Sequence, residues 1–213
     1  MAEEQLPNIL THIDPRDLAN ALVSAWRSIF NEAPKRESIL VILAQSALET
    51  GRWRYCHAWN IGNIKHVPGD GRGFTYYRCN EVEHGKVVWY DPPNPACAFR
   101  AFRTLEEGAV DHLAFLRKRF AAAWHAVELG DPRVFVQQLK AHGYFTADEK
   151  PYENSVASIF HEYDGGLQFE VKPDDAPLDE DTKARVMGLV ALSLSEIGRA
   201  DFARETDPDN QNA

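Results

Sequence analysis

Apolar residues recur at the period of an α-helix near the start of the chain. The pair Asp14-Pro15 favours a helix start, because the carboxylate caps free backbone N–H groups and proline fits the first helical position. The apolar stripe that follows consists of Leu18, Leu22, Ala25 and Ile29. This spacing predicts one amphipathic helix that ends near Ala33.

The stretch from about residue 36 to residue 50 is apolar on nearly all sides. A helix without a polar face is normally surrounded by other elements, so we expect this one at the centre of the core. Gly51 follows at the position where a glycine commonly ends a helix.

Residues 52–103 carry aromatic, glycine and proline residues in short runs. Segments 74–79 and 86–90 are typical of two strands around a turn at His84-Gly85, and 98–102 of a third short strand. The pattern therefore changes from helical to extended in this part of the chain.

Helical signals resume at Thr104, which forms a capping box with Glu107. Further helices are expected between residues 131 and 143 and between residues 151 and 163. The predicted fold class is α+β, mostly helical, with a small β-hairpin lobe and a C-terminal helix.

The predicted organisation has three parts. Residues 1–170 form one domain, 171–178 an acidic linker, and 179–213 an amphipathic helix and tail. The apolar face of that last helix consists of Val186, Val190, Leu194 and Ile197. This face requires a partner, which is the chain's own domain, a second copy or a carrier protein. We favour docking on the chain's own domain.

The charge distribution restricts the partners. The formal net charge is −9, and residues 173–213 alone contain ten acids and four bases. A general nucleic-acid binder needs clustered lysines and arginines, so this class is disfavoured. No run of about 18 apolar residues exists, which predicts no membrane span.

The first fifteen residues lack the apolar core of a secretory signal. We therefore expect synthesis in the cytoplasm. Any action outside the cytoplasm then needs an export route other than a cleaved signal.

The three cysteines, Cys56, Cys79 and Cys97, are too few and too scattered for a disulfide framework. One bridge is possible, but we expect reduced thiols. No metal-ligand spacing is present, and the eight histidines are scattered.

Glu49 is the most notable ionisable residue. It lies at the C-terminal end of the apolar helix, where burial and the helix dipole both disfavour the charged carboxylate. A carboxyl that stays protonated near neutral pH is what a glycosidase uses as general acid. The alternative is a solvent-facing glutamate on the helix rim.

Four motifs in order carry a family resemblance. Residues 44–51 (AQSALETG) and 60–65 (NIGNIK) resemble the AQxALETGxG and NLFGIK motifs of the glucosaminidase family of peptidoglycan hydrolases, which has a lysozyme-like fold. Residues 99–108 resemble the family's FRxYxSxxES. The segment from Gly143 to Tyr152 resembles its GYATDPxY.

The resemblance implies roles for several residues. Glu49 is the expected general acid, and Glu81 on the hairpin is the expected second carboxylate, with Glu83 as its competitor. Tyr152 is expected beside the catalytic glutamate. The residues expected to bind substrate are Trp59, Asn60, Asn63, Lys65 and Tyr144.

The resulting prediction is a hydrolase of the β-1,4 bond between N-acetylglucosamine and N-acetylmuramic acid that uses no cofactor or metal. The alternatives within enzymes are a muramidase and a lytic transglycosylase. The alternative outside enzymes is a non-catalytic glycan-binding module, such as one from a phage tail.

A cell-wall hydrolase without a secretory signal acts in the periplasm or cell wall only after lysis, through a phage holin or through a secretion machine. A type VI antibacterial effector would also have an immunity protein that covers its cleft.

Overall fold

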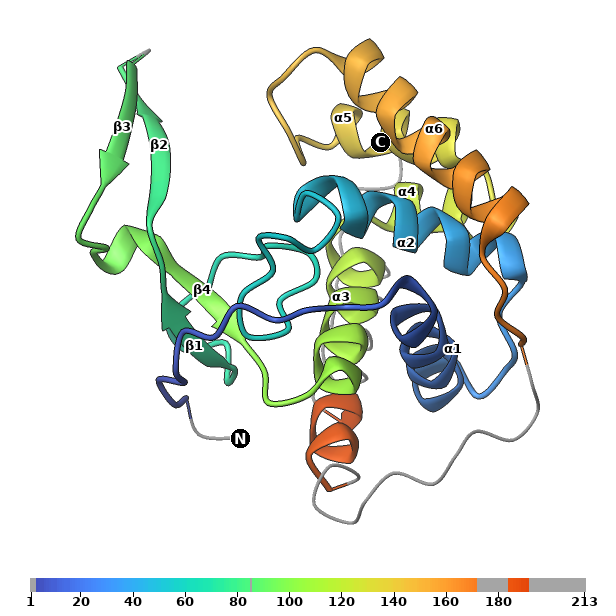
Figure 1. Ribbon diagram of the computed structural model, residues 1–213, viewed down its shortest axis with the longest axis horizontal. Helices are drawn as coiled ribbons and strands as arrows, with labels where there is room; N and C mark the ends of the chain where they lie inside the picture. The colour runs from blue at the N-terminus through green and yellow to red at the C-terminus, as the bar shows by residue number, and fades with distance from the viewer. Residues whose placement is uncertain (1–2, 85, 172–183, 192–213) are drawn as a thin grey trace, which may run out of the picture.

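The structure is a computed structural model that describes residues 3–84, 86–171 and 184–191; for residues 81–83 it describes the backbone only. The elements are α1 (Pro15–Phe30), α2 (Arg36–Glu49), β1 (Gly73–Tyr76), β2 (Cys79–Glu83), β3 (Lys86–Tyr90), η1 (Pro95–Cys97), β4 (Ala98–Ala101), α3 (Leu105–Arg119), α4 (Ala121–Leu129), α5 (Pro132–Ala141) and α6 (Glu149–Gly166). The helices form one body and the strands a separate lobe (Figure 1). This arrangement confirms the predicted α+β fold class.

The apolar helix α2 is the centre of the helical body. Ten of its residues are buried, from Ser38 to Ala47, and it contacts α1, α4 and α6. A helix covered from several directions needs apolar residues on every face, which explains the absence of a stripe in its sequence. Around it, α1 packs on α3, and α5 packs on α4 and α6.

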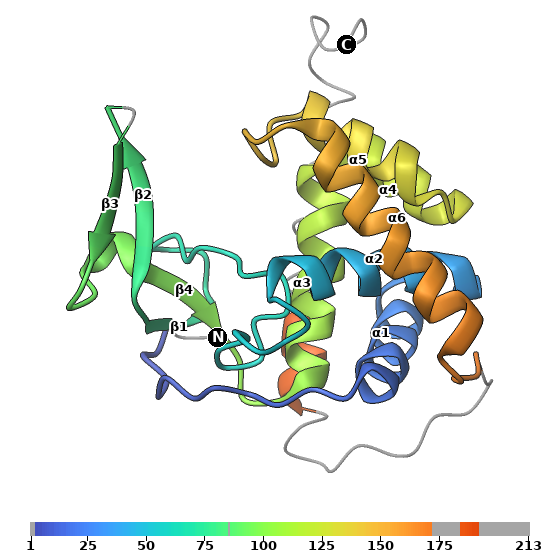
Figure 2. The same cartoon turned by 45° about the horizontal axis from the view of Figure 1, so that its top comes forward.

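The β lobe contains two antiparallel pairs rather than one three-stranded sheet. Strand β1 pairs with β4, with Phe74 opposite Arg100, and β2 pairs with β3, with Glu81 opposite Val88. Figure 2 shows the β2–β3 hairpin projecting from the lobe, while the chain that follows α2 runs between the lobe and the helices.

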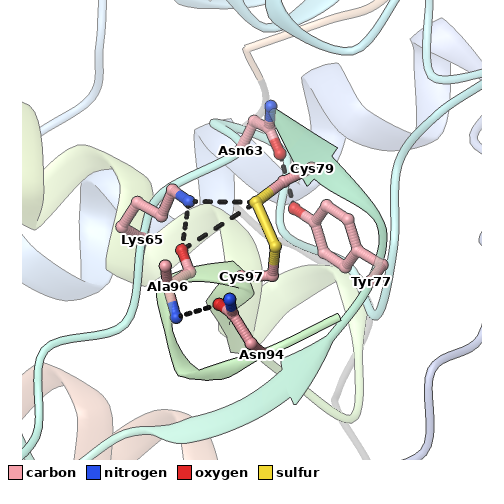
Figure 3. Close-up of a disulfide and its surroundings, with 7 residues drawn as sticks. All are labelled: Asn63, Lys65, Tyr77, Cys79, Asn94, Ala96 and Cys97. Atoms are coloured by element: carbon pink, nitrogen blue, oxygen red, sulfur yellow. Dashed lines mark hydrogen bonds between the residues drawn. A yellow bond between two sulfur atoms is a disulfide. The ribbon is translucent and has the colours of Figure 1, made fainter. Parts of the chain in front are cut away.

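Cys79 and Cys97 form a disulfide, so the expectation of reduced thiols was wrong for these two residues. Their Cα atoms are 5.7 Å apart although 18 positions separate them in sequence. Folding of the lobe brings the start of β2 beside η1, a proximity that cysteine spacing alone does not reveal (Figure 3). Cys56 is a free, buried thiol.

A buried ion cluster joins the β lobe to α3. Asp111 on α3 accepts hydrogen bonds from Arg72 and from Arg100, and Arg100 also contacts Asp70 at 3.2 Å. Burial alone would raise the pKa of Asp111, but the two arginines hold it below its usual value. The carboxylate is therefore charged, and it ties together segments from both parts of the molecule.

Residues 184–191 are helical and dock on the same body. Val186, Leu189 and Val190 are buried in the main hydrophobic cluster, and Arg185 pairs with Glu107 of α3. The segment lies against the end of α3 in Figure 1. The chain's own domain thus covers this part of the predicted apolar face, whereas Leu194 and Ile197 lie outside the described residues.

None of the described helices combines the length and the apolar character needed to cross a membrane.

Candidate active site

Glu49 is the last residue of α2, and its carboxyl is partly buried. The helix stops here because Gly51 takes a left-handed conformation with φ of 57°, which turns the chain away. Burial raises the pKa of Glu49, while hydrogen bonds from Tyr152 and Gln45 partly offset that rise. The net effect favours the protonated acid, as expected from its position in the sequence.

Tyr152, from the first turns of α6, contacts this carboxyl directly. Its hydroxyl donates a hydrogen bond of 2.6 Å to Glu49 Oε1. The ring is held by stacking on Phe145, with centroids 4.2 Å apart. Burial, followed by the nearby Glu49 charge, raises the pKa of Tyr152 far above its usual value, so the phenol remains a donor. The structure therefore brings together two of the three predicted catalytic residues.

A row of hydrogen-bonded polar side chains next to Glu49 was not predicted from the sequence. Gln45, one helical turn earlier and completely buried, donates to the Tyr144 hydroxyl at 2.7 Å. Its Oε1 lies 3.0 Å from His112 Nε2. The signal available in the sequence was the i, i+4 spacing of Gln45 and Glu49 on one apolar helix.

His112 is neutral in this chain of contacts. Burial lowers its pKa to about 4, and the amide oxygen of Gln45 can only accept, so we assign the ring proton to Nε2. His112 Nδ1 faces Gly62, where a Cβ atom would come within 2.3 Å of it. Only glycine fits at this point, and the loop before Asn63 can therefore approach α3 closely.

Asn60 holds the loop after α2 in place. It is 2% exposed, its amide nitrogen donates to the carbonyls of Ile64 and Arg100, and its amide oxygen accepts from the Ile64 N–H. These three bonds occupy the side-chain amide of Asn60 with backbone groups of the loop and of β4. Trp59 is partly buried and packs against the main core.

The described residues form a cleft with two arms that meet at Glu49. Both arms are lined by Glu49, Asn63 and Lys65, so they are continuous. The first, which we call the cationic arm, has a volume of about 580 Å³ and also includes Arg100, Phe115, Lys118, Arg119, Phe120 and Tyr144. The second, the aromatic arm, has about 520 Å³ and includes Tyr55, His57, Tyr77, Arg78, Trp89 and Phe99.

Two predicted binding residues are fixed at the junction of the arms. Asn63 accepts a hydrogen bond from the Tyr77 hydroxyl. Lys65 donates to the Ala96 carbonyl and lies 4.3 Å from the centre of the Phe99 ring (Figure 3 shows the first of these contacts). Volumes of this size suit a ligand of one or a few sugar units.

The second carboxylate stays a prediction. The backbone places Glu81 opposite Val88 and Glu83 opposite Lys86 in the β2–β3 hairpin. Their side chains lie outside the described part of the structure.

Within the described residues, one group has the donor types of a metal site: Glu3, His66 and Asp70. None of the three lines either arm of the cleft. The oxygens of Glu3 and Asp70 already accept hydrogen bonds from backbone N–H groups, and Asp70 also contacts Arg100. This group reaches the cleft only indirectly, through the contact of Asp70 with Arg100.

Comparison with known families decides the identity of the domain. The family model described as Glucosaminidase, mannosyl-glycoprotein endo-beta-N-acetylglucosaminidase, matches residues 29–165. The chain belongs to the glucosaminidase family. The matched range contains α2, the β lobe and α6, so the glucosaminidase domain includes Glu49, Tyr152 and both arms of the cleft. The domain is a glycoside hydrolase.

Solved structures of hydrolases resemble the glucosaminidase chain at low identity. A C-terminally truncated glycoside hydrolase domain of Salmonella typhimurium FlgJ is 21% identical with a TM-score of 0.48, over 72% of this chain and 99% of that one. A peptidoglycan hydrolase mutant from Sphingomonas sp. A1 is 19% identical with a TM-score of 0.43, over 79% and 99%.

The catalytic domain of the Listeria monocytogenes autolysin Auto is 16% identical with a TM-score of 0.49, over 73% and 88%. A search of curated protein sequences finds no significant match.

Proposed function

We propose that this glucosaminidase hydrolyses the β-1,4 bond between N-acetylglucosamine and N-acetylmuramic acid in peptidoglycan, with Glu49 as general acid. The observation that carries the proposal is the position of Glu49. Its carboxyl has a raised pKa, receives a hydrogen bond from Tyr152, and lies where the two arms of the cleft meet. The resemblance of residues 44–51 and 60–65 to motifs of peptidoglycan hydrolases supports this choice of substrate.

The proposed reaction starts with transfer of the Glu49 proton to the glycosidic oxygen. The bond from that oxygen to the anomeric carbon then breaks, water adds to the anomeric carbon, and the water's proton returns to a carboxylate. Tyr152 holds Oε1 of Glu49, which leaves Oε2 to meet the substrate. Glu81 is the proposed second carboxylate, which activates water or stabilises the positive charge on the sugar.

Glu49→Gln is the direct test of this proposal. The amide has nearly the same shape but cannot donate the proton to the leaving oxygen, so we expect clearing of insoluble cell wall to fall by about 10²–10⁴-fold. Circular dichroism checks that the variant is folded. Clearing at the wild-type rate would refute the role of Glu49.

Mass analysis of the products identifies the bond. New reducing ends on N-acetylglucosamine are expected. Reducing ends on muramic acid would instead show a muramidase, and anhydro-muramic ends a transglycosylase. Wall binding without any new ends would show a glycan-binding module.

We further propose that the protein acts outside the cytoplasm, in the periplasm or cell wall. The Cys79–Cys97 disulfide supports this site of action, because disulfides persist in oxidising compartments and are rare in the cytosol. Alkylation of free thiols under denaturing conditions, which expose the buried Cys56, tests it in protein recovered from intact cells: one modified cysteine is expected, and three would contradict it. An immunity protein and a secretion-machine partner stay predictions from the sequence.

A further inference from the structure

The two arms of the cleft differ in charge. Four cationic side chains line the cationic arm: Lys65, Arg100, Lys118 and Arg119. Among the described residues of this arm, Glu49 is the only acid, and its raised pKa favours the neutral form. The arm therefore has an excess of positive charge in a chain whose formal net charge is −9.

The four cations of this arm differ in their exposure to solvent. Arg100 is buried and bound to Asp111 and Asp70, which compensate its guanidinium. Lys118 and Arg119 are exposed at the C-terminal end of α3, next to Phe120 in the wall of the arm, and Lys65 is partly exposed. Lys118 and Arg119 are therefore the exposed cations that belong to the cationic arm alone.

The aromatic arm has the opposite character. Five of its eleven lining residues carry flat rings, and Trp89 is 54% exposed. Its cations are Arg78 and Lys65, and Lys65 is shared with the cationic arm. The guanidinium of Arg78 lies 4.5 Å from the Trp89 ring centre and 3.3 Å from the Asp91 carboxylate, so an acid offsets its charge. Aromatic faces suit the apolar face of an uncharged sugar.

The difference in charge between the two arms matches the alternation of charged and neutral sugars in the proposed substrate. Every second sugar of a peptidoglycan strand carries a 3-O-lactyl group, which ends in a carboxylate or in a peptide that bears carboxylates. The sugars on the two sides of the cleaved bond therefore differ in charge. Glu49 lies at the junction of one arm suited to each of them.

We infer that Lys118 and Arg119 bind the carboxylate on the 3-O-lactyl substituent of muramic acid, and so place that sugar in the cationic arm and the neutral sugar in the aromatic arm. The inference rests on the proposed peptidoglycan substrate. Positive residues also complement the dipole at a helix end, but that role does not depend on the charge of the glycan. The two roles can therefore be separated by varying the substrate.

The experiment uses three soluble glycan strands. One retains its peptides, a second has been freed of them by an amidase and ends in lactyl carboxylates, and a third is the second with its carboxylates converted to neutral amides. We expect wild-type kcat/KM to be about tenfold higher on a carboxylate-bearing strand than on the amidated strand. If kcat/KM is higher on the peptide-bearing strand, the bound carboxylate is on the peptide. If it is higher on the amidase-treated strand, the bound carboxylate is on the lactyl group.

The variant K118Q/R119Q should reduce this carboxylate preference about fivefold. The effect is modest because each exposed ion pair contributes little free energy. One molar salt should reduce it in the wild type for the same reason. The control R16Q/R117Q removes the same charge from exposed Arg16 and from Arg117, which lies outside both arms. It should retain the full preference.

Equal kcat/KM on amidated and carboxylate strands, or a preference that K118Q/R119Q retains, would overturn the inference. Binding of the three strands to Glu49→Gln separates this inference from the proposed function. If the wild type cuts none of them, the proposed function fails. Tighter binding of carboxylate strands to Glu49→Gln would still support the cationic arm, and equal or absent binding would overturn it.

Discussion

At the scale of single residues, the surroundings of Glu49 set its protonation. Burial raises the pKa of Glu49 and so favours the neutral acid. The hydrogen bond from Tyr152 lowers this pKa, because a donor stabilises the carboxylate. The buried amide of Gln45 adds a second opposing contact and also fixes Tyr144 and His112. Polar side chains from two helices, Gln45 of α2 and Tyr152 of α6, thus position the acid and limit the rise of its pKa.

Tyr152→Phe should move the pH dependence of the reaction in a defined direction. Loss of the hydrogen bond removes a contact that lowers the pKa of Glu49, so that pKa rises further and the protonated acid persists to higher pH. The alkaline limb of the kcat–pH profile should shift upward. The rate at the optimum should fall about tenfold, because the carboxyl loses a contact that orients it.

Tyr163→Phe is the matched control. Tyr163 is on the same helix, but its hydroxyl contacts Arg52 at 3.3 Å rather than Glu49. This variant should leave the profile in place. An unchanged or downward-shifted alkaline limb in Tyr152→Phe would contradict the role assigned to the hydrogen bond.

At the scale of elements, the disulfide fixes the base of the β2–β3 hairpin. It links the first residue of β2 to the last residue of η1, and Lys65 packs beside it with its ammonium near Cys79 Sγ (Figure 3). The hairpin carries Glu81 and Trp89. The covalent link therefore restrains the element on which the proposed second acid lies.

Reduction of this disulfide should lower the free energy of unfolding by about 3 kcal/mol, as expected for a closed loop of this length. Urea unfolding with and without a reductant measures the change. In a C79A/C97A variant the reductant should have no effect, which controls for other actions of the reagent. A wild type with the same stability in both conditions would show that the link does not restrain the lobe.

At the scale of the whole molecule, buried charge holds the two parts together. Asp111 on α3 bridges Arg72, just before β1, and Arg100 in β4. Removal of a buried partner leaves uncompensated charges that water cannot reach. The same contacts position Arg100 in the wall of the cationic arm.

Asp111→Asn should therefore lower the free energy of unfolding by about 3–5 kcal/mol. In the wild type the pKa of Asp111 is lower in the folded state, so its contribution is present above the unfolded pKa of about 3.9 and is lost as the pH falls through the folded value.

Chemical denaturation at a series of pH values tests both statements. The acid-dependent loss should be smaller in Asp111→Asn than in the wild type. Asp148→Asn, at an exposed position without a side-chain cap bond, is the control and should change little. A decrease of less than about 1 kcal/mol in the free energy of unfolding in Asp111→Asn would show that the cluster does not hold the β lobe to the helical body.

The sequence by itself determined most of the helical body, α4 (Ala121–Leu129) excepted, and singled out Glu49 as the candidate acid. The Asp-Pro starts, the capping box at Thr104 and the periodic apolar residues are local signals, and each of these helices forms where expected. Glu49 stood out because a carboxyl at the end of an apolar helix is locally anomalous. The motif from Gly143 to Tyr152 placed Tyr152 beside it.

Only the tertiary structure decided the contacts between distant segments. The Cys79–Cys97 bridge, the Asp111 ion cluster and the chain from His112 through Gln45 to Tyr144 join positions that are far apart in sequence. The two-armed cleft likewise needs α3, the loop after α2 and the β lobe at once. Hydrophobic periodicity and caps act over a few residues, whereas pairing and cleft shape depend on how packed elements meet in space.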